Sequence, residues 1–133
     1  MRAMVEKHYL DMAPYASLSL QEVFDVIKSL PFRPDPDEAE VLMRPLYTMS
    51  MQGCGGDCDD KSIALASYCR LLNIPYQFVA VRAQGKKVLH HVYLRCYIKN
   101  AYMPQGMWII ADPTYRFNLL GRERMRYADH VII

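Results

Sequence analysis

The chain has 133 residues, of which 52% are hydrophobic and 23% are charged, a composition typical of globular proteins. The formal net charge is only +2, which argues against binding dominated by nucleic acid or by an anionic membrane surface. The first residues lack the apolar run of a signal peptide, and no stretch approaches membrane-spanning length. Four cysteines without an export signal favour reduced thiols in a cytoplasm.

The first part of the chain predicts helices that cover a core and carry no chemistry. A capping box that begins at Ser19 and apolar residues at helical spacing predict a helix over about 18–30, which Pro31 ends. A second helix is expected to start with Asp35 as its cap and to end or kink near Pro45. The region up to about residue 50 is therefore expected to be a helical cover.

The most informative stretch is a glycine-rich turn that begins at Gln52 and leads into a helix of about 58–72. Asp57 can cap this helix, and Asp60 can bond back to the cap. Cys58 then lies in the first turn, at the positive end of the helix dipole, where a thiol tends toward the nucleophilic thiolate. Neighbouring aspartates oppose such a shift of the pKa. On this stretch alone, a small buried cysteine in a helix cap is an equally good interpretation.

The residues that follow predict a small antiparallel sheet. The helix is expected to have one apolar face that includes Leu72, and to stop at Asn73 in the left-handed conformation. Residues 76–82 are apolar on both sides, which predicts an internal strand. A hairpin turn leads into an alternating strand over 88–99, and a third strand is expected over 107–111. Because helices precede strands, the predicted class is α+β.

The predicted sheet brings together side chains that could perform nucleophilic chemistry. Antiparallel pairing puts the start of the second strand beside the end of the third, so His90 or His91 is expected near Asp112. The opening of the helix that carries Cys58 can reach the same edge. An imidazole could then take the thiol proton while the carboxylate fixes its tautomer. Alternation places His90 on the apolar face and His91 on the more polar one, which favours His91 as the base.

Several short motifs follow one another along the chain: Gly56-Asp57-Cys58, Asn73-Ile74-Pro75, His91-Val92-Tyr93 and Trp108-Ile109-Ile110-Ala111-Asp112-Pro113-Thr114. Over about 52–115 the chain resembles the transglutaminase-like superfamily of papain-fold cysteine enzymes, and most of all its short phage and prophage members. The resemblance implies a papain-like core, with Cys58 as nucleophile, His91 as base and Asp112 as the orienting acid. It also implies a peptide or protein substrate and no cofactor.

The resemblance leaves the oxyanion site open. The Cys58 amide is a natural donor at a helix N-terminus. Gln52 resembles the Gln-Gly segment that precedes the nucleophile of papain-like peptidases, although a surface glutamine in a loop explains it equally well. Tyr47 is a further candidate, since other members use an upstream aromatic residue. Two positions depart from the family pattern: Asn73 replaces a glycine, and Tyr93 replaces the commoner tryptophan.

The cysteines also allow a zinc site or a disulfide. Cys54, Cys58, Cys69 and Cys96 could supply four thiolates. Against this, Cys69 lies about 16 Å along the helix from Cys58. A disulfide between Cys54 and Cys58 would silence the nucleophile, and reducing surroundings argue against it. We therefore expect no metal.

The sequence thus predicts one domain over 1–133, with a catalytic core over about 52–115 and a C-terminal extension over 116–133. The extension carries a basic run that Glu123 interrupts, and we interpret this run as a solvated face in preference to a phosphate site: Arg116, Arg122, Arg124 and Arg126. The predicted activity is cysteine-dependent hydrolysis of a peptide or isopeptide bond, with transamidation as a variant. The alternative is an inert transglutaminase-like binding or assembly module, for instance in a phage particle.

Overall fold

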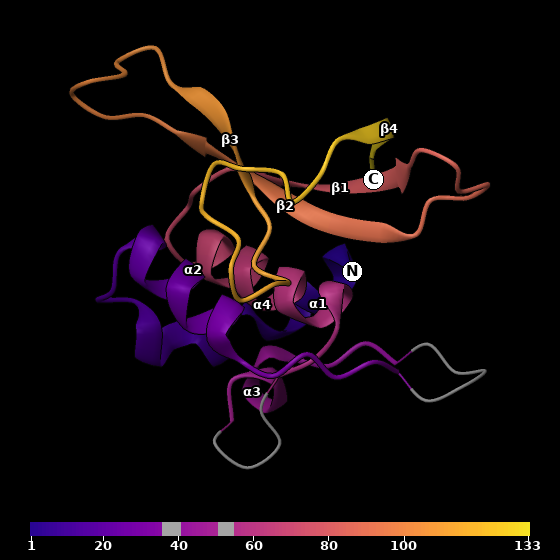
Figure 1. The fold of residues 1–133 in the computed structure, drawn as a ribbon. Helices are drawn as coiled ribbons and strands as arrows, with labels where there is room; N and C mark the ends of the chain where they lie inside the picture. Colours follow the sequence, from indigo (N-terminus) through magenta and orange to yellow (C-terminus); the bar gives the residue numbers. More distant parts are fainter. Residues whose placement is uncertain (36–40, 51–54) are drawn as a thin grey trace.

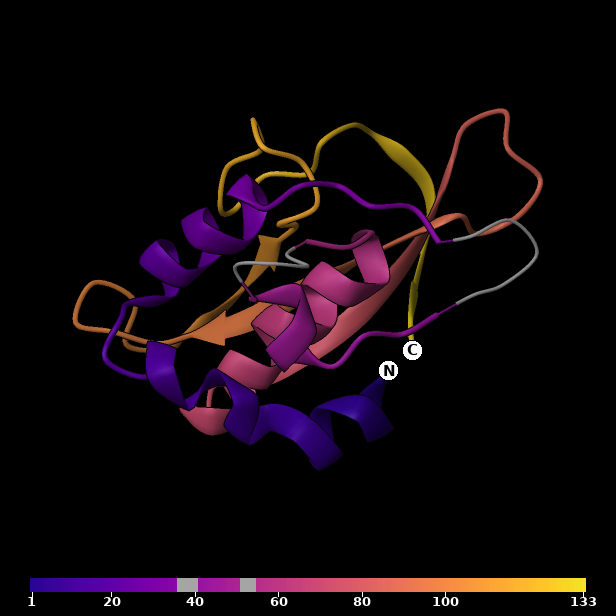
Figure 2. The ribbon, with the colours of Figure 1, turned by 90° about the horizontal axis from the view of Figure 1, so that it is seen from below.

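The fold is described from a computed structural model that defines residues 1–35, 41–50 and 55–133 (Figure 1). Helices lie on one face of a four-stranded antiparallel sheet, as Figures 1 and 2 show from two directions. The predicted α+β class is confirmed. The helical elements are α1 (Arg2–His8), the 3-10 helix η1 (Tyr9–Tyr15), α2 (Leu20–Ser29), α3 (Pro45–Thr48) and α4 (Cys58–Leu71). The strands are β1 (Tyr76–Ala83), β2 (His91–Ile98), β3 (Met107–Ala111) and β4 (Tyr127–Ile132), in the spatial order β3-β2-β1-β4.

Helix α2 forms where the sequence predicts it. The Ser19 side chain accepts a hydrogen bond from the Glu22 backbone N–H, and the Glu22 carboxylate accepts one from the Ser19 N–H. This capping box satisfies two amides that the first turn leaves without partners. No described helix is long and apolar enough to cross a membrane.

The prediction of a second helix that ends near Pro45 is wrong for the part of it that the structure describes. Residues 41–44 have no regular structure, and α3 begins at Pro45 instead of ending there. A proline suits the first turn of a helix because it has no N–H to satisfy and its φ is already helical. The Asp35 carboxylate accepts a hydrogen bond from the Val41 N–H, six residues further along the chain. Residues 36–40 lie outside the described part.

Helix α4 is the centre of the fold. It lies between the sheet and the N-terminal helices, so all its residues from Asp60 to Cys69 are buried. The prediction of a single apolar face was therefore too narrow, and Leu72, assigned to that face, is exposed. Asn73 ends the helix with a φ of 59°, which confirms the predicted left-handed stop.

The sheet adds one strand to the three that the sequence predicts. β1 is internal as predicted, because it pairs with β2 on one side and β4 on the other. β4 lies in the predicted C-terminal extension and is a short, mostly exposed edge strand. β2 starts at His91, three residues later than expected. Its register with β3 places Leu94 opposite Ala111, which sets the position of the residues after β3.

The turn before α4 depends on Gly55, which has a φ of +96°. A Cβ at this position would strike the Pro31 carbonyl group, in addition to the strain of a left-handed backbone. We expect Gly55→Ala to lower the free energy of unfolding by about 3 kcal/mol. Gly85→Ala is the matched control, because Gly85 has a similar φ of +88° but nothing within 4 Å of the added Cβ. Urea denaturation of both variants checks this, and equal losses would contradict the proposed clash.

Candidate active site

Cys58 is the first residue of α4, and a capping box holds its position. The Asp57 carboxylate accepts hydrogen bonds from the backbone N–H groups of Asp59 (3.1 Å) and Asp60 (3.2 Å). The Asp60 carboxylate accepts one from the Asp57 N–H at 3.2 Å, as the sequence predicts. The N–H of a first helical residue has no carbonyl partner within its helix. The Cys58 amide is therefore available to hydrogen-bond an oxyanion.

Burial governs the acidity of the Cys58 thiol. Burial is the largest cause, and together with the charges of Asp59, Asp57 and Asp112 it raises the pKa of the thiol to about 12. A hydrogen bond from the Val92 backbone opposes the shift but does not offset it. The expectation that the helix dipole makes Cys58 a resting thiolate is therefore wrong. The thiol is protonated at neutral pH, so a nucleophilic role requires a base beside it.

His91 and Asp112 form the pair that the strand register predicts. His91 Nε2 lies 2.8 Å from Asp112 Oδ2, and both residues are buried. The second carboxylate oxygen of Asp112 accepts a hydrogen bond from the Thr114 N–H at 3.1 Å, while the Asn118 side chain donates to the Asp112 carbonyl at 3.1 Å. These contacts fix the carboxylate. Because Nε2–H donates to Asp112, Nδ1 is the ring nitrogen left to accept a proton.

His90 does not occupy the core position that alternation assigns to it. It precedes β2 and is exposed, and its Nε2 accepts a hydrogen bond from the Ala83 N–H at 2.9 Å. The imidazole thus closes the end of β1, whereas the neighbouring His91 turns toward Asp112.

Lys61 supports the site and was missed from the sequence. Its side chain is buried, and Nζ donates hydrogen bonds to the carbonyls of Leu30 (2.6 Å) and Thr114 (3.0 Å). Burial lowers the pKa of Lys61 to about 8, although the charge of Asp112 partly offsets this shift. The ammonium therefore ties α4 to the segment that holds Asp112. A lysine beside two aspartates has the pattern of a solvated helix end, so the sequence offered no signal for this role.

Three tyrosines surround the imidazole. The ring of His91 lies 6.3 Å from that of Tyr93, 5.9 Å from that of Tyr115 and 6.0 Å from that of Tyr127. Tyr93 also donates a hydrogen bond from its hydroxyl to Glu123 at 2.5 Å. Tyr115 and Tyr127 come from the chain after β3, for which the sequence predicted no role. These rings shield the His91–Asp112 pair from water, which strengthens its electrostatic interaction.

Not every residue named from the sequence can be placed at this site. Gln52, the oxyanion candidate, and Cys54 are outside the described residues. Tyr47, the second oxyanion candidate, lies on α3 and is 59% exposed. Cys69 and Cys96 form a separate buried pair of free thiols, with their sulfurs 3.5 Å apart.

In the part of the chain that the structure describes, the one set of side chains spaced to hold a metal ion is Asp35, Asp57 and Asp60. Each of these carboxylates already accepts a backbone hydrogen bond. The set contains no cysteine, so the described cysteines do not form the zinc site considered from the sequence.

The buried carboxylate of Asp60 predicts how stability depends on pH. Burial raises the pKa of Asp60 to about 7, and repulsion from Asp57 contributes. Because this pKa exceeds the unfolded value of 3.8, the stabilisation is complete below about pH 4 and is lost as the pH rises to about 7. We expect the free energy of unfolding to fall by about 2 kcal/mol between pH 5 and 7. The lowered pKa of Asp11 acts only below this window.

Urea denaturation at several pH values measures this slope, and the same titration of Asp60→Asn is the control. The asparagine keeps an acceptor for the Met43 N–H but cannot ionise. Because burial also raises the pKa of Asp57, we expect the stability of this variant to fall less with pH than that of the wild type. A wild-type stability that rises with pH would contradict the assignment.

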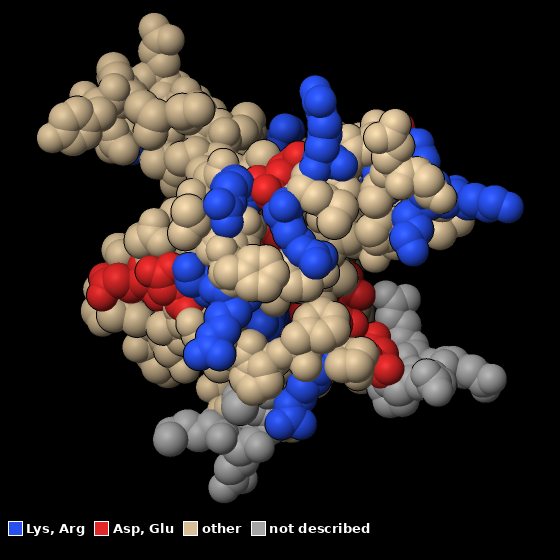
Figure 3. Space-filling view, viewed as in Figure 1, with Lys and Arg blue, Asp and Glu red and all other residues tan. Residues whose placement is uncertain are grey.

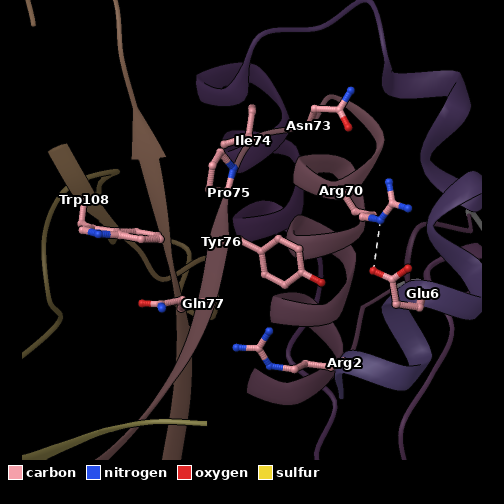
Figure 4. A pocket seen from close by; sticks show the side chains of 9 residues that line it. All are labelled: Arg2, Glu6, Arg70, Asn73, Ile74, Pro75, Tyr76, Gln77 and Trp108. Atoms are coloured by element: carbon pink, nitrogen blue, oxygen red, sulfur yellow. Dashed lines mark hydrogen bonds and ion pairs between the residues drawn. The ribbon is translucent and has the colours of Figure 1, made fainter. Parts of the chain in front are cut away.

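A pocket of about 720 Å³ lies at the opposite end of α4 (Figure 4). It is lined by residues around Arg70 and Trp108, and Arg70 pairs there with Glu6 at 3.0 Å. Neither Cys58 nor His91 lines it, and the length of α4 places it about 20 Å from Cys58. We therefore do not assign it to the candidate active site.

Comparison with known proteins identifies a family for the chain. The family model for the transglutaminase-like superfamily matches residues 11–113, which include Cys58, His91 and Asp112. The match begins well before the motifs that carry the resemblance, so it also covers part of η1 and all of α2. No curated protein and no solved structure matched the chain. The match covers more than half of the chain, and the protein therefore belongs to the transglutaminase-like superfamily.

Proposed function

We propose that the protein is a thiol-dependent enzyme that transfers the acyl group of an amide, with Cys58 as nucleophile, His91 as base and Asp112 as orienting acid. The main support is the bond of 2.8 Å between His91 Nε2 and Asp112 Oδ2. It leaves Nδ1 to accept a proton beside a strand whose next residue, Val92, hydrogen-bonds Cys58. The raised pKa of the thiol fits a mechanism in which the base removes the proton during attack.

In this mechanism His91 Nδ1 takes the proton from the Cys58 thiol as the sulfur bonds to the carbonyl carbon. The Cys58 N–H stabilises the oxyanion, and Gln52 stays a second candidate for this role. The carbon–nitrogen bond then breaks, and His91 gives its proton to the leaving amine. Water attacks the thioester, His91 takes a proton from that water, and the carboxylic acid and the free thiol are released. Asp112 holds the imidazole throughout and stabilises its positive charge.

Hydrolysis of a peptide or isopeptide bond is the outcome we favour. Transamidation requires a site that admits an amine and excludes water, and none is identified among the described residues. The alternative function is an inert binding or assembly module. The carboxylates of Asp57 and Asp59 beside the nucleophile favour it, because they raise the pKa of the Cys58 thiol. The His91–Asp112 pair argues for the enzyme, since a binding module has no need of an oriented imidazole.

Acylation with p-nitrophenyl acetate at neutral pH tests the proposal. An active site should release one nitrophenolate per protein in a fast burst, and peptide mapping should find the acetyl group on Cys58. The buried thiols of Cys69 and Cys96 are internal controls that should stay unmodified. Adding a primary amine then distinguishes hydrolysis from transamidation by whether acetyl amide forms. An inert module would give no burst, and no preference for Cys58 over surface lysines.

A further inference from the structure

Aromatic side chains form a stacked surface beside the candidate active site. The ring of Tyr115 stacks on Phe32 at 6.2 Å and on Phe117 at 6.1 Å, with interplanar angles of 13° and 16°. Its centroid lies 5.9 Å from that of His91. Phe32 is 50% exposed and Phe117 is 67% exposed. Contiguous exposed apolar groups of this kind mark interaction sites in many proteins, which makes this surface a candidate for binding.

The same surface adjoins the nucleophile. Phe32 forms a short parallel bridge with Gly56, where the Gly56 N–H donates to the Pro31 carbonyl at 3.2 Å and the Arg33 N–H donates to the Gly56 carbonyl at 3.0 Å. Gly56 lies two residues before Cys58. The aromatic stack therefore extends from the turn that precedes the nucleophile to the ring of His91, where a bound substrate has to pass.

Arginines border the stack. The guanidinium carbon of Arg124 lies 3.8 Å from the centre of the Tyr115 ring, and Arg116 is exposed next to Tyr115 in the chain. The ion pairs identified between described residues involve neither guanidinium. Figure 3 shows lysine and arginine side chains gathered on this face, over the chain between β3 and β4. The surface is thus both aromatic and positively charged.

Glu123 does not neutralise these arginines, although it interrupts the basic run in the sequence. Its carboxylate accepts a hydrogen bond from the Tyr93 hydroxyl at 2.5 Å and contacts His130 Nε2 at 2.6 Å. It is therefore engaged with β2 and β4. The basic run was interpreted as a solvated face because Glu123 interrupts it, and this argument does not hold once Glu123 is engaged elsewhere.

We propose that Phe32, Tyr115, Phe117, Arg116 and Arg124, together called the Tyr115 surface, bind an acidic segment of the peptide substrate that also carries aromatic or large apolar side chains. The proposal rests on the proposed function, because it places this segment beside the bond that Cys58 attacks. Carboxylates would pair with the guanidinium groups, and apolar side chains would cover the exposed rings. Asp57 would repel the same segment at the start of α4, which favours its placement over the arginines.

Peptide binding by the full chain carrying Cys58→Ala tests this inference without turnover. The probe is a peptide of two Glu-Phe-Glu-Gly repeats with a neutral dye, and versions with Gln or Lys in place of Glu differ only in charge. We expect fluorescence anisotropy to show about tenfold tighter binding of the glutamate peptide than of the glutamine peptide, and weaker binding still of the lysine peptide. Raising the salt concentration should reduce the preference.

Variants localise the binding. Arg116→Glu combined with Arg124→Glu should weaken binding of the glutamate peptide about tenfold, and Phe117→Ala should weaken binding of all three peptides. Lys87→Glu with Lys99→Glu changes the net charge equally at exposed positions outside the Tyr115 surface, so this control should bind as the parent does. If the charge-reversed arginine protein is not folded by circular dichroism, Arg116→Gln with Arg124→Gln replaces it and should show a smaller loss in the same direction.

Equal affinity for the three peptides, no binding of any of them, or equal losses in the arginine and lysine variants would overturn the inference. Acetylation of wild-type Cys58 separates this failure from failure of the enzyme proposal. If Cys58 is acetylated but the protein does not prefer the acidic peptide, only the proposed role of the Tyr115 surface is contradicted. If the protein binds the acidic peptide but is not acetylated, the enzyme proposal is contradicted.

Discussion

Replacing Cys58 by alanine is expected to abolish acyl transfer while the fold stays intact. The thiol is the only atom proposed to bond to the substrate carbonyl carbon, so its removal leaves only oxyanion stabilisation and binding. We expect turnover to fall by about 10⁴-fold or more. The Cys58 side chain is only partly buried at the edge of the core, and the cap that starts α4 comes from Asp57 and Asp60. Thermal unfolding should therefore change little.

Cys69→Ala is the matched control for the loss of a thiol. Cys69 lies on the same helix but packs against Cys96 in the core, away from the proposed chemistry. We expect this variant to lose about 1 kcal/mol of stability and to keep its activity. Residual turnover in Cys58→Ala, or loss of turnover in a folded Cys69→Ala protein, would contradict the assignment of the nucleophile.

Replacing His91 by alanine should have the second largest effect. Because burial raises the pKa of Cys58 to about 12, the thiol cannot supply a useful fraction of thiolate at neutral pH without a base. Loss of a general base typically costs about 10²- to 10⁴-fold in rate, and we expect a loss in this range. Single-turnover acetylation of Cys58 by p-nitrophenyl acetate measures it. The rate should partly recover at high pH, where hydroxide deprotonates the thiol.

His90→Ala is the neighbouring control. The imidazole of His90 accepts a hydrogen bond from Ala83 at an exposed position, so its loss should cost only about 1 kcal/mol of stability and no activity. The opposite pattern, in which His91→Ala stays active while a folded His90→Ala protein does not, would show that the imidazole was assigned to the wrong residue.

Local signals in the sequence predicted the parts of the site that depend on neighbouring residues. Both capping boxes, at Ser19 and at Asp57, involve residues three apart and form as expected. The contact between His91 and Asp112 was also predictable, because antiparallel pairing across one connection fixes which residues meet. The conformation of Asn73 followed from its own side chain.

Features that depend on distant partners were not predictable in this way. Lys61 is buried because carbonyls of Leu30 and Thr114 accept its hydrogen bonds, and neither residue is near it in the sequence. β4 forms only because β1 offers it a free edge. The acidity of Cys58 was misjudged because the helix dipole is visible in the sequence, whereas the burial that outweighs it is produced by the fold.

The central claim is that Cys58, His91 and Asp112 act as one unit, and a double-mutant cycle tests it most directly. The measurement is the single-turnover rate of Cys58 acetylation in the wild type, His91→Ala, Asp112→Asn and the protein that carries both substitutions. If Asp112 acts only through the imidazole it holds at 2.8 Å, the double variant should be as slow as His91→Ala alone. Losses that multiply in the double variant, or an Asp112→Asn protein with the wild-type rate, would contradict the claim.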